Sequence, residues 1–170
     1  YASSGSMYSL SLAKSYISED FLLLESDIIY ENIALTNILN SSKQDLILLA
    51  GPSHASDEVY VEGTNDLISG MSKNKEELNK IVGELVGITK ISYKLFNKMI
   101  RISENLFNNT LHVAYETDCL VEASKTHRIY YELVDDLIWS EIDDEHHYKR
   151  AKGTIYPKIQ EKDYSTSKCN

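Results

Sequence analysis

Proline is scarce in this chain, and the places where it occurs limit how the chain can fold. Pro52 and Pro157 are the only two prolines among 170 residues. Proline lacks a backbone N–H and its ring clashes with the preceding turn, so it interrupts helices. Over most of the roughly one hundred residues between them, apolar side chains recur at helical spacing. We therefore predict an all-α fold: an antiparallel helical bundle with three long helices and one or two short ones.

The first long helix is predicted over residues 7–39. Its acidic side chains, Glu25 and Asp27 among them, are placed on the face that points to solvent. A short helix is predicted over residues 43–50, and Gly51 followed by Pro52 ends it, because glycine suits a helix C-terminus and proline blocks continuation. Seven apolar residues define the buried stripe of the first helix: Leu10, Ile17, Phe21, Leu24, Ile28, Leu35 and Ile38.

Residues 53–71 show the least regular pattern of the chain. Val59, Tyr60 and Val61 have the composition of a short strand. An isolated strand without a partner is not stable, so we favour a loop or a single helical turn here.

The second long helix is predicted to begin at Asn74, where Asn74 and Glu77 resemble a capping pair. Gly83 and Gly87 lie four positions apart in it and would admit a close helix neighbour. Apolar residues continue the pattern by threes and fours: Leu78, Ile81, Leu85, Ile88, Leu95, Met99, Ile102 and Leu106.

A break is predicted at residues 108–110, because asparagine and threonine prefer helix ends to helix interiors. A third long helix then covers residues 111–148. The bundle domain spans residues 7–150 and an extended polar tail spans residues 151–170. We interpret residues 1–6 as a cloning remnant or a processed N-terminus.

Composition excludes several classes of protein. The net charge of −9 argues against a nucleic-acid binder, which needs a basic surface. No apolar run reaches the ~18 residues that a membrane span requires, and contact with a membrane surface is not favoured. Cys119 and Cys169 could form one disulfide, although two free thiols are favoured. Asn40 and Asn108 begin tripeptides of the glycosylation type, so the compartment stays undecided.

Four ionisable residues fall on core-facing lines of the predicted helices: Glu31, Glu116, His127 and Glu141. Helical bundles that hold paired metals combine such residues with a Glu-x-x-His step, which this sequence lacks. Asp143 with His146 and Asp144 with His147 come nearest to it. We favour the interpretation that these groups lie at the edges of a narrow apolar stripe, and we predict neither a metal site nor a cofactor.

No catalytic constellation is evident. His146 and His147 are adjacent, so on a helix they point about 100° apart and chelate one ion poorly. Cys119 precedes His127 by eight residues, but no neighbouring group would activate the thiol. A non-enzymatic role is therefore favoured.

Lys90, Lys94, Lys98 and Arg101 would share one face of the second long helix. A basic face in an acidic protein is a candidate partner-binding surface. The competing interpretation is a solvated face neutralised by acidic neighbouring helices.

The resulting functional hypothesis is association with a protein partner, either self-assembly or membership of a larger complex. The wide apolar stripe and the twelve tyrosines support it. One alternative is an extracytoplasmic ligand-sensing or surface-exposed bundle. A second alternative is a carboxylate-bridged metal protein of the bundle type. No motif ties the chain to a known family.

Overall fold

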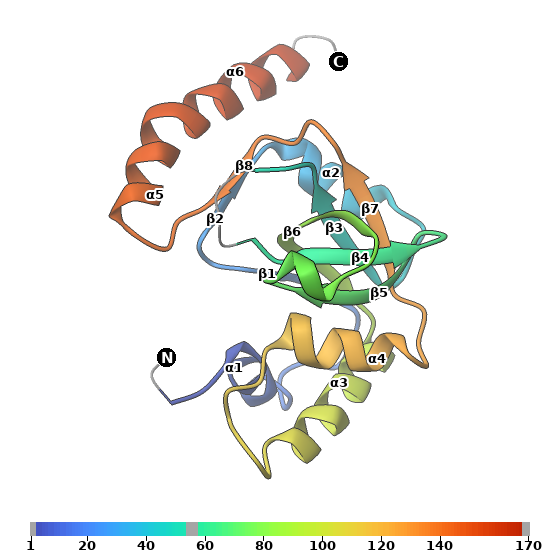
Figure 1. Ribbon diagram of the computed structural model, residues 1–170. Helices are drawn as coiled ribbons and strands as arrows, with labels where there is room; N and C mark the ends of the chain where they lie inside the picture. The colour runs from blue at the N-terminus through green and yellow to red at the C-terminus, as the bar shows by residue number, and fades with distance from the viewer. Residues whose placement is uncertain (1–2, 54–57, 168–170) are drawn as a thin grey trace.

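The chain forms a mixed α/β fold in which a curved six-stranded sheet is covered by helices on both faces. Figure 1 shows this arrangement in a computed structural model, which describes residues 3–53 and 58–167. A separate two-stranded sheet lies beside the main one. The strands are β1 (Phe21–Leu24), β2 (Ile28–Tyr30), β3 (Leu46–Ala50), β4 (Tyr60–Thr64), β5 (Leu67–Ser72), β6 (Ile81–Ile91), β7 (Tyr130–Val134) and β8 (Trp139–Glu141).

The helical elements are mostly short. Three of them are not α-helical: η1 (Lys75–Glu77) is a 3₁₀ turn, and η2 (Tyr115–Leu120) and η3 (Ala151–Ile155) are π-helical. The α-helices are α1 (Ser6–Leu12), α2 (Asn32–Asn40), α3 (Tyr93–Leu106), α4 (Val121–Ser124), α5 (Glu145–Arg150) and α6 (Tyr156–Ser167).

The main sheet has the strand order β1-β6-β3-β7-β5-β4. β3 and β7 are parallel, and the other neighbours are antiparallel. β6 is long enough to pair with β1 and β3 and, through its first half, with β4. Five strands therefore close into a barrel-like ring, and β1 extends the sheet beyond it. β2 and β8 form the two-stranded sheet, with Ile28 opposite Glu141.

β3 lies at the centre of the core and is buried along its whole length. Ile47 and Leu49 face the apolar cluster under α1, α3, η2 and α4. Leu46, Leu48 and Ala50 face a second cluster that α2 and Trp139 complete. A strand buried on both faces has a continuous apolar sequence without alternation, which is why residues 43–50 resemble a short buried helix.

The prediction of an all-α helical bundle is wrong, and so is the coiled-coil packing of helices that such a bundle implied. β6 explains the error best, because it covers the first half of the predicted second helix. Its residues from Glu84 to Thr89 are all buried, so it shows no polar alternation that would identify a strand. Only α3 in the second half is helical. Ser92 caps it, with its Oγ accepting a hydrogen bond from the Leu95 N–H at 3.0 Å.

The other two predicted long helices are also divided. Residues 7–39 form α1, β1, β2 and most of α2, and residues 111–148 include η2, α4, β7 and β8. The strand composition of Val59–Val61 does belong to a strand, since β4 begins at Tyr60 and pairs with β5 and β6. The chain breaks predicted at Gly51 and at residues 108–110 coincide with the ends of β3 and α3.

Residues 151–167, predicted to be extended, are helical and continue α5 through η3 into α6. Lys162 on α6 forms ion pairs with the carboxylates of Glu31 at 3.1 Å and Asp136 at 3.0 Å, and these hold α6 against the rest of the fold. Cys119 is a buried free thiol, and Cys169, the other cysteine of the predicted pair, lies outside the described residues. Within residues 3–53 and 58–167, no helix has the length and hydropathy needed to cross a membrane.

Candidate functional site

The candidate site begins where β1 ends. The Glu25 N–H donates a hydrogen bond to the Gly87 carbonyl at 2.9 Å, which holds this turn against β6. Gly87 has φ +81°, and a Cβ on it would lie 2.5 Å from the Glu25 carboxylate. Glycine is therefore required at this position both for the backbone conformation and for the space that the Glu25 side chain occupies.

The pairing of β2 with β8 brings a distant carboxylate to the same place. Ile28 is opposite Glu141, and the Ile142 N–H donates to the Asp27 carbonyl at 2.8 Å. As a result, Glu25, Asp27 and Glu141 each place a carboxylate oxygen within 4.8 Å of the others.

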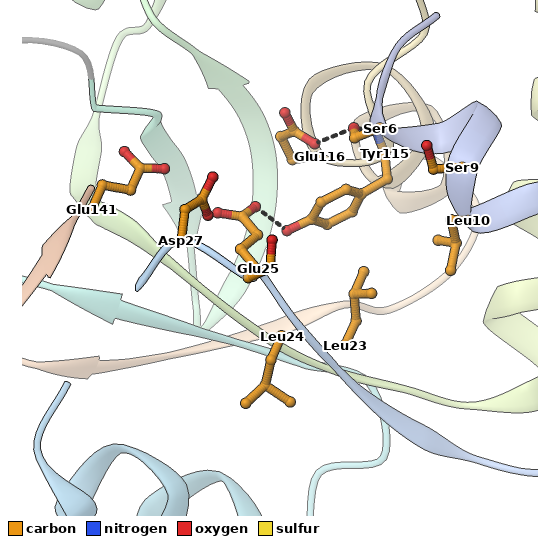
Figure 2. Close-up of a pocket in the computed structure, with 11 residues that line it drawn as sticks. Ser6, Ser9, Leu10, Leu23, Leu24, Glu25, Asp27, Tyr115, Glu116 and Glu141 are labelled. Atoms are coloured by element: carbon orange, nitrogen blue, oxygen red, sulfur yellow. Dashed lines mark hydrogen bonds between the residues drawn. The ribbon is translucent and has the colours of Figure 1, made fainter. Parts of the chain in front are cut away.

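These three carboxylates line one side of a pocket of about 400 Å³. Figure 2 shows Glu141, Asp27 and Glu25 on one side of Tyr115, and Ser6, Ser9 and Leu10 of α1 on the other. Leu23 and Leu24 of β1 supply apolar wall, and Glu116 lies beside Tyr115. The volume falls within the range of small-molecule sites, about 300–1,000 Å³.

A chain of hydrogen bonds joins the two sides of the pocket. The Tyr115 hydroxyl donates to Glu25 Oε1 at 2.5 Å. Ser6 Oγ donates to Glu116 Oε2 at 3.2 Å and accepts from the Tyr115 N–H at 3.0 Å. Ser6 therefore fixes both the start of η2 and the Glu116 side chain.

The surroundings of the pocket disfavour the ionised forms of its carboxyl groups, Glu25 and Glu116, and so raise their pKa values. Burial raises the pKa of Glu25, and the nearby Glu116 and Asp27 raise it further, whereas Tyr115 and Lys73 oppose the shift. Burial also raises the pKa of Glu116. The pKa of Tyr115 is raised well above its ordinary value, chiefly by burial and then by Glu25, so its hydroxyl keeps its proton. The pocket is thus a site whose carboxylates would be stabilised by a bound cation.

The donor set fits a hard divalent cation. Carboxylate oxygens are the ligands that Mg²⁺ and Ca²⁺ prefer, and Mg²⁺ characteristically uses one or two of them beside water and substrate phosphate oxygens. Three carboxylates converging at one edge of a pocket meet that requirement. Neither a histidine nor a cysteine belongs to this group.

Only part of the sequence-predicted ionisable set comes together. Glu116 and Glu141 line the same pocket. Glu31 is 2% exposed and pairs with Lys162 instead. His127 Nε2 lies 2.6 Å from Asp45 Oδ2. Asp45 precedes β3 and also accepts a hydrogen bond from Ser92 at the start of α3, so His127 belongs to a structural contact that joins β3, α3 and the segment before β7.

Asp144, His146 and His147 form a second group whose ligand atoms lie within 4.8 Å of one another. The adjacent histidines are brought close, with ring centroids 6.1 Å apart, although adjacency on a helix predicts divergence. Asp144 is the N-cap of α5 and accepts a hydrogen bond from the His147 N–H at 2.7 Å.

The predicted basic face is divided between two elements. Lys90 lies on β6 and donates to the Ser41 carbonyl at 3.0 Å. Lys94, Lys98 and Arg101 lie on α3, where Lys98 contacts the Thr126 hydroxyl. Partner binding by these four residues stays a prediction.

Sequence reasoning missed Glu25, Asp27 and Tyr115 as site residues. It placed the two carboxylates on the outer face of a helix. The signal that could have found them is the run Phe21–Leu24 followed at once by Glu25 and Asp27, since a short apolar strand often delivers polar groups to a site at its end.

Comparison with known proteins relates this fold to one class of enzyme. No protein-family model matches the chain. The bifunctional protein GlmU of Methanococcus aeolicus is 31% identical to it over 127 residues, which are 74% of this chain and 29% of that protein. The chain thus spans less than a third of this curated relative.

Solved structures show the same fold. The inositol-1-phosphate CTP transferase from T. maritima superimposes with a TM-score of 0.74 at 18% identity, covering 92% of this chain and 63% of that one. The CTP:phosphocholine cytidylyltransferase from Streptococcus pneumoniae gives a TM-score of 0.67 at 14% identity, covering 90% and 64%. The chain therefore has a nucleotidyltransferase-type fold and spans slightly less than two thirds of these structures.

These findings correct the functional interpretation. The association hypothesis and both of its alternatives assumed a helical bundle, and the fold is not one. The structural neighbours are a CTP transferase and a cytidylyltransferase, not bundle proteins that act by association.

Proposed function

We propose that this chain belongs to an Mg²⁺-dependent nucleotidyltransferase that joins a nucleotide to a phosphate ester. The observation that carries the proposal is the convergence of Glu25, Asp27 and Glu141 at the edge of an open pocket, at the end of β1. The nucleotidyltransferase-type fold and the similarity to GlmU support this choice of reaction.

The reaction is an exchange at phosphorus. An oxygen of the acceptor's phosphate attacks the α-phosphorus of a nucleoside triphosphate, and the bond from that phosphorus to the bridging oxygen of the β-phosphate breaks. Pyrophosphate leaves with that electron pair, and the product is a diphosphate-linked nucleotide. When bound, the divalent cation supplies positive charge that offsets the phosphate oxygens.

This chain's own residues bind and orient the reactants. Glu25, Asp27 and Glu141 offer carboxylate ligands to the cation, and the Tyr115 hydroxyl holds Glu25 in place. Lys73 is exposed and close enough to lower the pKa of both Glu25 and Glu116, so it can contribute positive charge to a phosphate in the pocket. Leu23 and Leu24 exclude water from one wall.

The experiment tests the metal first and turnover second. We expect calorimetric titration to show Mg²⁺ binding that Asp27→Asn and Glu141→Gln each weaken by at least about tenfold. Pyrophosphate release from CTP or another nucleoside triphosphate, with phosphocholine, inositol 1-phosphate or glucose 1-phosphate as acceptor, should fall in parallel. Glu104→Gln is the matched control, because Glu104 lies in an exposed ion pair with Lys14. Equal Mg²⁺ affinity in all four proteins would contradict the proposal.

We separately propose that Lys90, Lys94, Lys98 and Arg101 contact a protein partner or a second copy of the chain, and that the chain does not bind nucleic acid. The exposure of Lys94 and Arg101 on α3 supports the partner contact.

A further inference from the structure

A second pocket lies at the same edge of the main sheet as the carboxylate site. β1 and β3 are both antiparallel to β6, and β7 is parallel to β3, so these three strands point in one direction. The carboxylate site lies at the end of β1. The second pocket, of about 320 Å³, lies where β3 and β7 end, at Gly51 and Asp135. The carboxyl ends of parallel strands are the usual place for ligands in sheets covered by helices.

The C-terminal helical run supplies basic side chains to this pocket. Arg150 is the last residue of α5, and Lys158 lies on α6. Both line the pocket together with Trp139 of β8, and we call it the Arg150 pocket. The carboxylate site differs, because no lysine or arginine is found among the described residues that line it.

Arg150 is held in place, but its charge is not neutralised. Its Nη2 donates to Ser140 Oγ at 3.0 Å, and Ser140 is 2% exposed on β8. Its Nε is buried without a hydrogen-bond partner, and no described residue pairs a carboxylate with the guanidinium. Arginine is seldom removed from water without a partner, so an orphaned donor on a half-buried guanidinium marks a place where an anion would be stabilised.

The remaining charges of the Arg150 pocket also favour an anion. Asp136 lines the pocket, but its carboxylate is paired with Lys162 at 3.0 Å. Asp135 is the other acidic residue of the lining. Arg150 and Lys158 therefore bring two positive charges against the single negative charge of Asp135. This is a local positive surplus in a chain whose net charge is −9.

We infer that the Arg150 pocket binds a phosphate-type oxyanion between Arg150 and Lys158, as free phosphate or pyrophosphate or as the phosphate group of a larger molecule. The guanidinium presents N–H donors in a planar arrangement that matches phosphate oxygens, and the Lys158 ammonium adds a point charge. Trp139 and Ile155 supply apolar wall. This site does not involve the carboxylates of the proposed cation site.

The test uses Trp139, the single tryptophan of the chain, as a reporter inside the pocket. Inorganic phosphate, pyrophosphate and glucose 1-phosphate are each titrated into the full chain in EDTA, which removes divalent cations. We expect a saturable change in Trp139 emission with phosphate and pyrophosphate, matched by calorimetric heat, and none with chloride at the same ionic strength. Glucose 1-phosphate that binds more tightly than phosphate would identify the phosphate group of a larger molecule as the occupant, and weaker binding would identify the free anion.

Variants of the two basic residues locate the contact. We expect Arg150→Gln to weaken phosphate binding at least about tenfold, the effect of losing a charge-assisted contact, and Lys158→Gln at least about threefold. Arg150→Lys keeps the charge without the planar donors, so its affinity should lie between those of the wild type and Arg150→Gln. Because Lys158 is exposed, Lys158→Gln provides the test if Arg150→Gln does not fold.

Lys149→Gln is the matched control, because it removes one positive charge beside Arg150 from an exposed pair with Glu145 at 2.9 Å. Its phosphate affinity should stay within about twofold of the wild type. Trp139 emission that phosphate and pyrophosphate leave unchanged, a chloride response as large as theirs, or wild-type affinity in Lys158→Gln would overturn the inference.

This proposal and the proposed function fail in different ways. Phosphate binding in EDTA without any Mg²⁺ binding would contradict the nucleotidyltransferase proposal and support the Arg150 pocket. Mg²⁺ binding that Asp27→Asn weakens, with Trp139 emission insensitive to phosphate, would support the first proposal and overturn the second. Asp27→Asn itself should leave phosphate binding in EDTA within about twofold of the wild type, because Asp27 does not line the Arg150 pocket.

Discussion

At the scale of single residues, Gly87 positions the candidate metal ligand Glu25 although it has no side chain of its own. It accepts the hydrogen bond that fixes Glu25, and it leaves the space in which the Glu25 carboxylate lies. Its φ of +81° is one that residues with a Cβ seldom adopt. The backbone conformation of Gly87 on β6 therefore determines the position of the Glu25 carboxylate, a proposed metal ligand, on the neighbouring turn.

We predict that Gly87→Ala disturbs the site and the fold together. The added Cβ would lie 2.5 Å from Glu25 Oε2 and 2.8 Å from its Cδ, so the carboxylate must move. The expected cost in unfolding free energy is about 1–3 kcal/mol, the range for such backbone strain. Urea denaturation measures the cost, and Mg²⁺ titration should show weakened binding.

Gly153→Ala is the control for that substitution. A Cβ on Gly153 meets nothing within 4 Å, and the residue is helical, so alanine should stabilise the protein by about 0.5–1 kcal/mol. Unchanged Mg²⁺ affinity in Gly87→Ala would show that Gly87 does not position Glu25.

At the scale of elements, one buried carboxylate joins three segments of the chain. Asp45 precedes β3 and is 5% exposed. Its Oδ1 accepts from the Ser92 N–H at 2.7 Å, and its Oδ2 accepts from Ser92 Oγ at 3.0 Å and lies 2.6 Å from His127 Nε2. The start of α3 and the approach to β7 are therefore fixed to β3 by the same side chain.

We predict that Asp45→Ala costs about 2–4 kcal/mol in unfolding free energy, because it leaves buried donors without an acceptor. Asp20 allows a matched comparison. Its Oδ1 accepts a hydrogen bond at 2.8 Å from the backbone N–H of Tyr93, the residue that follows Ser92 at the start of α3. This hydrogen bond is exposed to solvent, unlike those of Asp45. Asp20→Ala should cost less than about 1 kcal/mol. Equal losses in urea denaturation would contradict the importance of burial.

From the sequence, the residues of α3 are predicted to be helical and the chain is predicted to break after α3 and after β3, because these features depend on local signals. The predicted helix nevertheless begins at Asn74, well before the start of α3. Ser92 and the amphipathic face of α3 can be recognised within a few residues. β3 and β6 cannot be recognised in this way, since both are buried on two faces and their apolar residues fit a helical period as well as a strand.

The carboxylate group of Glu25, Asp27 and Glu141 could not be predicted from the sequence for a related reason. Glu141 and Asp27 are 114 residues apart and meet only because β2 pairs with β8. No spacing rule links them. Glu116 and Glu141 were identified as unusual polar positions, but the assumed bundle placed both on one long helix over residues 111–148 and left Glu25 and Asp27 exposed to solvent on another.

At the scale of the whole molecule, the acidic pocket links metal binding to stability. The folded protein raises the pKa of Glu116 and Glu25 through burial. A carboxyl whose folded pKa lies above its unfolded value contributes stability when it is protonated, and that contribution is lost as pH rises through the folded pKa. Four other carboxyls have lowered pKa values, so their stabilising contributions are lost only in more acidic solution: Asp20, Glu62, Asp136 and Asp144.

We therefore predict that the metal-free protein loses unfolding free energy as pH rises above the ordinary carboxyl pKa range, and that Glu116→Gln reduces this loss. A bound divalent cation stabilises the ionised carboxylates, so saturating Mg²⁺ at pH 7 should restore the lost stability through linkage. Urea denaturation at pH 5.5, 6.5 and 7.5, with Mg²⁺ or with EDTA, measures both effects. Asp27→Asn should remove the Mg²⁺ effect, whereas Glu104→Gln should follow the wild type. A wild-type protein whose stability is the same with Mg²⁺ and with EDTA would show that the pocket does not couple metal binding to folding, because any cation held only by the folded state must raise its stability.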